Sequence, residues 1–263
     1  MVDVMQPKNI LVFGDSNAEA LKHVATDENG NSVRVMHPEG VSWPDVAQSK
    51  LGSMYNIVNI SLTNRNGFIK SKSGNGDKVE YLESGLDCFR ELLSQEIEKH
   101  GEMAAIVIPL GTNDLQWLYN LSPADFEKGL NHLIGITKEL NPNGKIILIP
   151  PPILTDHKQE LLENWSHQFD ERSIELSEVV QETYKKVAEE TESCKLFDFN
   201  PIAKEFSIEK TLSSQEILPD GLHYSAVLHA CFGTAFAEHI NELLDLRPKQ
   251  DVSSTPNRLT IDK

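Results

Sequence analysis

Three short clusters of polar residues along the chain hold the side-chain types that acyl transfer requires. Ser16 ends the tripeptide Gly-Asp-Ser, and Asn113 is the third residue of Gly-Thr-Asn-Asp. Asp220 precedes His223 by three residues in Asp-Gly-Leu-His. A serine hydroxyl becomes a nucleophile when an imidazole accepts its proton, and a carboxylate beside that imidazole sets its tautomer. An asparagine amide can donate a hydrogen bond to the oxyanion that forms on the attacked carbonyl.

Each cluster, taken alone, also has an ordinary structural interpretation. A serine that precedes a helical turn is commonly its N-cap, and an asparagine after a strand commonly forms an Asx-turn. A lone histidine ahead of a helix is more often a surface or core residue. The hypothesis of chemistry therefore rests on the joint occurrence of nucleophile, base, orienting acid and oxyanion donor in one chain.

The elements that must position these clusters are predicted from hydrophobic patterning. Apolar runs rich in Val, Ile and Leu are typical of parallel strands covered on both faces, and they span residues 9–13, 56–60, 104–110, 145–149 and 195–197. Amphipathic helices are predicted over residues 43–51, 83–100, 123–140, 170–192 and 226–246, with Ser122 and Ser225 as candidate N-caps.

This alternation predicts an α/β fold, a three-layer α/β/α domain around a five-stranded parallel sheet. Ligands of such sheets bind beyond the carboxyl ends of the strands. Ser16 follows the first predicted strand and Asn113 follows the third, so both lie where that rule expects a site.

Composition excludes several classes of protein. The 263 residues carry a formal net charge of −16, which argues against nucleic acid as a partner because phosphate contacts need a basic face. No stretch approaches the roughly 18 apolar residues of a spanning helix, so no membrane span is expected. Cys88, Cys194 and Cys231 are far apart, which predicts reduced thiols and neither a disulfide framework nor a zinc site. The N-terminal apolar run lacks a basic flank, so we expect no signal peptide and a cytoplasmic location.

The three clusters resemble the sequence blocks of the SGNH (GDSL-like) hydrolase superfamily. The resemblance spans roughly residues 9–246 and is greatest with the arylesterase and acyltransferase branch, on Trp43-Pro44 and the prolines at 150–152. It implies a flavodoxin-like SGNH hydrolase fold and a serine esterase that hydrolyses, or transfers, a small acyl group. It also implies a Ser16–His223–Asp220 triad that requires no metal or organic cofactor.

The same resemblance implies an oxyanion hole made by the N–H groups of Ser16 and Asn64 and by the Asn113 side chain. Relatives commonly carry glycine where this chain has Asn64, and leucine where it has Asn17. Asparagine tolerates left-handed backbone geometry better than most residues, and a backbone N–H survives substitution.

Alternative interpretations remain open from the sequence. The chain could be a non-catalytic SGNH-fold binding protein, or a carbohydrate O-acetylesterase or thioesterase. A flavin or nucleotide binder is disfavoured because no phosphate-cradling glycine loop follows a strand. A nucleophile-elbow hydrolase is disfavoured because Ala18 occupies the last position of G-x-S-x-G.

The predicted domain organisation is one hydrolase domain, residues 1–247, followed by a disordered tail, residues 248–263. Two irregular segments, residues 61–80 and 150–168, are expected beside the site. The expected partner is a small-molecule acyl ester, and relatives that form oligomers make a homo-oligomer a further expectation.

Overall fold

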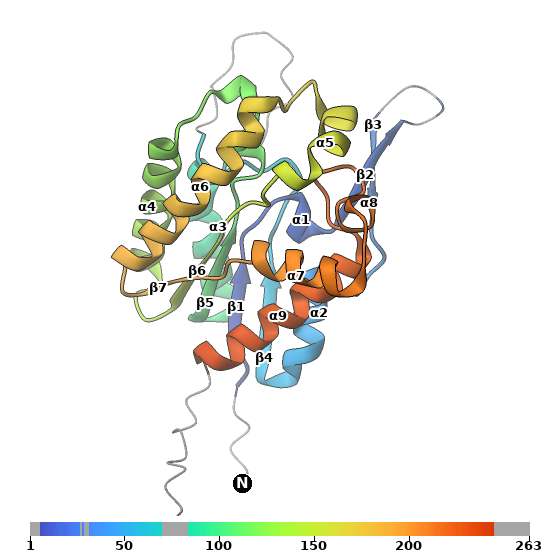
Figure 1. Ribbon diagram of the computed structural model, residues 1–263. Coiled ribbons are helices and arrows are strands. Elements are labelled where there is room, and N and C mark those ends of the chain that lie inside the picture. Colours follow the sequence, from blue (N-terminus) through green and yellow to red (C-terminus); the bar gives the residue numbers. More distant parts are fainter. Residues whose placement is uncertain (1–5, 27, 29–31, 70–83, 245–263) are drawn as a thin grey trace, which may run out of the picture.

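A five-stranded parallel sheet forms the centre of the computed structural model, which describes residues 6–26, 28, 32–69 and 84–244 (Figure 1). Its strands are β1 (Lys8–Val12), β4 (Tyr55–Asn59), β5 (Met103–Pro109), β6 (Lys145–Ile149) and β7 (Cys194–Leu196). Their spatial order is β4-β1-β5-β6-β7, and every neighbouring pair is parallel. Counted along the chain this is the flavodoxin-like order 2-1-3-4-5, so the predicted fold class is confirmed.

Successive residues of each strand face opposite layers of the core. In β1, Ile10 and Val12 pack on one face of the sheet, whereas Leu11 and the following Phe13 pack on the other. This period of two explains why the strands read as continuous apolar runs: both faces are covered by helices.

One helical layer is formed by α3 (Gly85–His100), α4 (Pro123–Leu140) and α6 (Glu171–Glu190), and the other by α2 (Trp43–Leu51), α7 (Asn200–Lys210), α8 (Ser214–Ile217) and α9 (Ala226–Leu244). In the second layer the Trp43 ring of α2 lies against Phe232 and Phe236 of α9, with centroids 4.5 and 5.0 Å away. Ser122 closes a capping box with Asp125, as its candidate cap role predicted.

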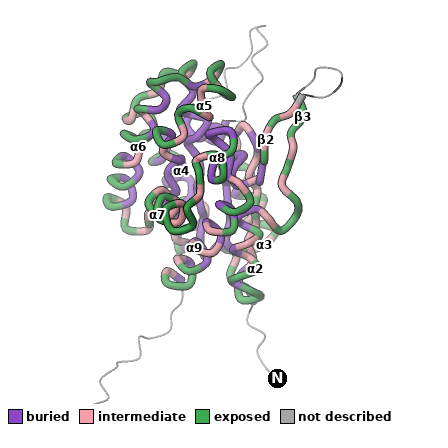
Figure 2. Tube along the Cα trace, turned by 45° about the vertical axis from the view of Figure 1, so that its right-hand side comes forward, coloured by how far each residue is buried: buried purple, intermediate pink, exposed green. Residues whose placement is uncertain are grey.

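Short helical elements and a hairpin occupy the connections. They are α1 (Ser16–Glu19), α5 (Lys158–Trp165), the 3₁₀ turns at Gly52–Met54, Asn113–Leu115, Trp117–Tyr119 and Thr155–His157, and the antiparallel pair β2 (Leu21–Thr26) and β3 (Ser32–Met36). Figures 1 and 2 show this hairpin reaching out from the body of the domain, with few buried positions along it.

One expectation from the sequence needs correction, and two features of the fold were not predicted. The hairpin was not predicted, although the sequence has an Asn-Gly pair followed by Val33, Arg34 and Val35, which alternate between apolar and polar. The segment 150–168 is not irregular throughout, because Leu161 and Trp165 give α5 a helical spacing. Helices α7 and α8 were also missed. The predicted tail, residues 248–263, and residues 70–80 of the first irregular segment lie outside the described residues.

Two findings concern the cysteines and the helices. Cys88, Cys194 and Cys231 are free thiols. Within the described ranges, no helix combines the length and the apolar character that crossing a bilayer requires.

Candidate active site

Ser16 is the first residue of α1, immediately beyond the carboxyl end of β1. The turn requires Gly14, because a Cβ there would lie 2.7 Å from Pro109 Cγ and 2.8 Å from Ala18 Cβ. The N-cap of α1 is Asp15, whose Oδ1 accepts from the Asn17 N–H at 3.1 Å. The N-cap interpretation of Ser16 is therefore wrong, and its hydroxyl is not engaged as a cap.

Asp220 and His223, predicted to act as orienting acid and base, are hydrogen-bonded to each other. Asp220 Oδ2 lies 2.7 Å from His223 Nδ1, and Asp220 Oδ1 accepts the N–H groups of Leu222 and His223 at 3.0 and 2.8 Å. Burial alone would raise the pKa of Asp220, but the His223 contact and the two N–H donors outweigh it and hold that pKa below its ordinary value. An ionised Asp220 fixes a proton on His223 Nδ1, which leaves Nε2 as the basic nitrogen.

The turn that brings Asp220 and His223 together depends on Gly221. Its φ is +81°, and a Cβ there would lie 2.3 Å from the Leu161 nitrogen on α5. Both the left-handed backbone and the close approach of α5 exclude a side chain at this position.

Asn113 lies in the 3₁₀ turn after β5 with one amide hydrogen already engaged. Its Nδ2 donates to the Arg65 carbonyl at 2.9 Å, and its Oδ1 accepts from Gln116 Nε2 at 3.4 Å. The first bond joins the loop after β5 to the loop after β4, which carries Asn64. The second amide hydrogen of Asn113 is left for a ligand.

Asn64 adopts the left-handed conformation, with φ of +66°. Asparagine tolerates this conformation better than most residues do. Among the described residues, no acceptor is bonded to the N–H of Asn64 or to that of Ser16. Both N–H groups are therefore available to an oxyanion.

The residues predicted for the site line a single cavity of about 1100 Å³. It holds Ser16, Asn64, Asn113, Asp220 and His223. Its walls come from the β2–β3 hairpin, from the end of α5 and from the loop before α9. The cavity lies beyond the carboxyl ends of β1, β4 and β5, which is the edge where the strand order reverses.

Asn17 was not assigned a function from the sequence, yet it joins the two halves of the site. Its Nδ2 donates to the Leu222 carbonyl at 3.2 Å, and its Oδ1 accepts the Tyr224 N–H at 3.0 Å. These peptide groups flank His223, so the residue after the nucleophile holds the segment that carries the base.

Two aromatic side chains on the cavity wall were also missed. The Trp165 ring packs edge-on against His223, with centroids 5.5 Å apart, and stacks on His167 at 5.9 Å. His37 Nε2 lies 3.0 Å from the Tyr224 carbonyl. No local motif marks either residue, since each reaches the site through a helix or a hairpin remote in sequence.

Two buried carboxylates lie behind the site. Burial raises the pKa of Asp15 to about 6 and that of Asp114 to about 7, and the charge of Asp15 adds to the rise at Asp114. Asp114 accepts the N–H groups of Gly67 and Phe68 at 2.6 and 2.8 Å. It thereby ties the chain after Asn64 to the turn that carries Asn113.

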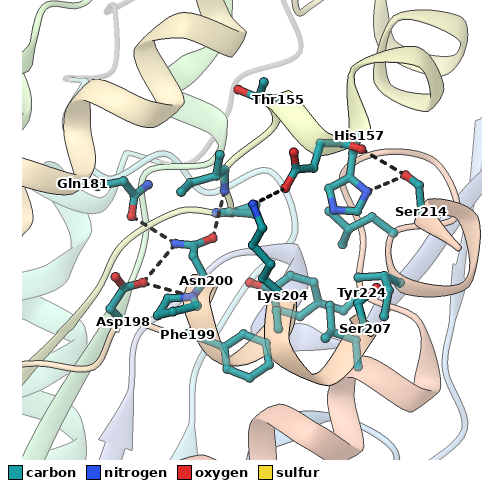
Figure 3. Close-up of a pocket in the computed structure, with 18 of the residues that line it drawn as sticks. Thr155, His157, Gln181, Asp198, Phe199, Asn200, Lys204, Ser207, Ser214 and Tyr224 are labelled. Carbon is teal, nitrogen blue, oxygen red and sulfur yellow. Dashed lines mark hydrogen bonds and ion pairs between the residues drawn. The ribbon is translucent and has the colours of Figure 1, made fainter. Parts of the chain in front are cut away.

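A second cavity, of about 720 Å³, lies between the turn before α5 and α7 and α8 (Figure 3). It contains a serine–histidine pair, with His157 Nδ1 2.7 Å from Ser214 Oγ. Burial lowers the pKa of His157, and none of the described carboxylate groups is bonded to its ring. This pair lacks the orienting acid that His223 has.

In the part of the chain that the structure describes, no group of three His, Cys, Asp or Glu side chains could hold a metal ion.

Comparisons with known proteins identify a family and similar solved structures. The family model described as GDSL-like lipase/acylhydrolase matches residues 10–236. No curated protein matches the chain. The native aryl esterase of M. smegmatis is 21% identical with a TM-score of 0.69, over 90% of this chain and 99% of that chain. Est24, a carbohydrate acetylesterase from Sinorhizobium meliloti, is 20% identical with a TM-score of 0.68, over the same shares.

The fold and the family match together define the class: an SGNH-type carboxylic ester hydrolase on a flavodoxin-like sheet. The chain belongs to the GDSL-like lipase/acylhydrolase family, because the family model covers most of its length. The two solved structures, at about one fifth identity, show the shared fold alone.

Proposed function

We propose that the chain cleaves a small acyl ester through a Ser16 acyl-enzyme, with His223 as base and Asp220 as its orienting acid. One observation supports this most. The Asp220–His223 pair, bonded at 2.7 Å, and Ser16 line the same cavity at the carboxyl edge of the sheet. The two hydrogen bonds of the Asn17 side chain, to Leu222 and Tyr224, connect the segment of Ser16 to the segment of His223.

In the proposed reaction, His223 Nε2 accepts the proton of Ser16 Oγ as that oxygen bonds to the ester carbonyl carbon. The oxyanion receives hydrogen bonds from the N–H groups of Ser16 and Asn64 and from the free amide hydrogen of Asn113. The tetrahedral intermediate collapses as His223 protonates the departing alcohol. Water then attacks the acyl-enzyme with His223 again as base, which releases the acid, and a second alcohol in place of water gives acyl transfer.

The first test is turnover of para-nitrophenyl acetate, butyrate and octanoate by wild type and Ser16→Ala. We expect Ser16→Ala to lose at least about a thousandfold in kcat. Ser214→Ala is the matched control, because Ser214 is the serine paired with a histidine in the second cavity, and it should retain full activity. The acyl-length profile then measures how deep the acyl pocket is.

A fluorophosphonate probe labels reactive serines. It therefore distinguishes an active enzyme that acts poorly on these three esters from a protein with no reactive serine. Labelling of wild type and Ser214→Ala, but not of Ser16→Ala, supports the proposal even where all three esters are poor. A folded wild type that neither turns over an ester nor takes up the probe favours the non-catalytic binding protein. Release of acetate from an acetylated oligosaccharide tests the alternative of a carbohydrate O-acetylesterase, and an acyl thioester tests that of a thioesterase.

A further inference from the structure

The proposed catalytic cavity has a charge opposite to that of the chain as a whole. The sequence contains 40 acidic and 24 basic residues, excluding histidine. The described residues that line the cavity include Lys22 and Arg34 and, apart from His223, three further histidines, His23, His37 and His167. Asp220 is the one carboxylate among them, and it is bonded to His223.

The two fixed cations come from the β2–β3 hairpin. Lys22 lies on β2 and Arg34 on β3, where Arg34 is directly opposite Val24. Residues opposite each other in an antiparallel pair share a face, and both Val24 and Arg34 line the cavity. Leu21, Val24 and Val41 add apolar surface to the same wall.

Neither cation is neutralised within the described protein. No ion pair or hydrogen bond joins the side chain of Lys22 or of Arg34 to another described residue. Both are exposed, so they can move toward a ligand. Two carboxylates on adjoining elements, those of Glu19 and Glu163, do not line the cavity, and each already accepts a hydrogen bond. Glu19 accepts the Thr63 N–H, and Glu163 accepts from Gln159.

We propose that the cavity selects esters that carry an anionic substituent, held by Lys22 and Arg34 on the hairpin wall. This inference rests on the proposed function and names its substrate class. A guanidinium offers a planar pair of donors that matches a carboxylate or a phosphate, and a lysine adds a mobile point charge. A basic cavity in an acidic protein also attracts anions selectively to the site itself.

The test uses matched esters that differ in charge. The mono-para-nitrophenyl ester of adipic acid and its methyl ester place the charge, or its neutral counterpart, on the acyl side. On the alcohol side, para-acetoxybenzoate and para-acetoxyphenyl phosphate are compared with para-acetoxybenzamide, which separates a carboxylate from a phosphate. Each ester is measured with wild type and variant, so the intrinsic reactivity of its leaving group cancels.

The variants are Lys22→Gln, Arg34→Gln and the double substitution. Lys185→Gln is the control, because it removes one exposed charge from α6, outside the cavity. We expect each cavity variant to raise KM for at least one anionic ester by roughly five- to tenfold and to change the neutral partner by less than about twofold. In wild type, about 0.5 M NaCl should reduce the preference for an anionic ester over its neutral partner, because exposed charges are screened over a few ångströms at that ionic strength.

Two results would overturn the inference while leaving the esterase intact. One is Ser16-dependent turnover of the neutral esters by wild type with no salt-sensitive preference for the anionic partners. The other is an equal loss on charged and neutral esters in the cavity variants, which would make the hairpin a steric wall. If no ester is turned over in a Ser16-dependent way, the proposed function itself fails. The salt dependence of wild type needs no variant, so it remains decisive if a substitution unfolds the hairpin.

Discussion

The side chain of Asn17 is hydrogen-bonded to the peptide groups on both sides of His223. Its Nδ2 donates to the carbonyl of Leu222 and its Oδ1 accepts the N–H of Tyr224, and all three residues are buried. Because Asn17 directly follows Ser16, one amide sets the spacing between the segment of the proposed nucleophile and the segment of the proposed base.

Replacing Asn17 by leucine should impair this chain. Leucine leaves the Leu222 carbonyl and the Tyr224 N–H without their buried partner, at a cost of about 1–3 kcal/mol in the free energy of unfolding. Misplacement of His223 should also lower kcat by roughly tenfold or more, with little change in KM. Urea unfolding and ester kinetics measure the two effects.

The control for Asn17→Leu is Asn143→Leu. Asn143 is exposed and bonded to Glu102 on the surface, so its replacement should change neither quantity appreciably. An Asn17→Leu protein with wild-type kcat would show that the two bonds do not position His223.

Asp220→Asn should keep the fold and lose most of the activity. The asparagine oxygen can still accept the N–H groups of Leu222 and His223, as Asp220 Oδ1 does. Its amide nitrogen would, however, face His223 Nδ1 and favour the wrong imidazole tautomer. We expect kcat to fall by about 10²–10⁴ with little change in the melting temperature.

The exposed Asp156, which pairs with Lys204 at 3.5 Å, provides a matched aspartate. Asp156→Asn removes the same charge and should retain wild-type kcat. Equal activity in Asp220→Asn and Asp156→Asn would remove Asp220 from the mechanism.

Asn64→Gly should leave both stability and turnover almost unchanged. The position has φ of +66°, which glycine adopts without strain, and the substitution retains the N–H proposed to bind the oxyanion. Asn64→Val keeps that N–H as well, but strain in the left-handed backbone should cost about 1–2 kcal/mol. We expect kcat within about twofold of wild type for the glycine variant. A large loss in Asn64→Gly would mean that the asparagine side chain, and not its N–H, acts in the reaction.

The sheet and the long helices could be predicted because each buries a periodic apolar surface. The predicted bounds of the five strands lie within about one residue of the observed bounds. Ile10, Val107 and their neighbours in the strands are apolar whichever face of the sheet they lie on, so each strand is a continuous apolar run in the sequence. The β2–β3 hairpin escaped prediction because it stands away from the core, where Val24 and Val33 are left exposed. Helix α5 is short and largely polar, with Leu161 as its one buried residue, so its apolar pattern was too weak to predict a helix.

Some residues of the candidate site could be predicted from local sequence motifs, whereas others could not. Ser16, Asn113, Asp220 and His223 lie in compact motifs next to strand ends or a helix start, so their meeting follows from the parallel sheet. Trp165 and His37 reach the cavity only through the tertiary packing of α5 and the hairpin segment. The position of Asn17 in the first motif did not indicate that its side-chain amide would form hydrogen bonds with the segment around His223.

The two buried carboxylates make stability depend on pH in a direction opposite to that of an ordinary ion-paired acid. The pKa of Asp114 rises from 3.8 to about 7 through burial, and that of Asp15 from 3.8 to about 6. The folded chain therefore holds protons that the unfolded chain releases. Their contribution to stability is complete below the unfolded pKa of 3.8, and it is lost as pH rises through about 6 and then about 7.

Asp114→Asn tests this dependence. Asparagine stays neutral, so the urea midpoint of the variant should fall less steeply than that of wild type between about pH 4.5 and about pH 7.5. Absolute stability should also drop, because one amide oxygen replaces the two oxygens that accept from Gly67 and Phe68. The difference in slope is therefore the informative quantity, with Asp156→Asn as the exposed control. Parallel slopes in wild type and Asp114→Asn would mean that the buried carboxyl of Asp114 does not take up a proton on folding.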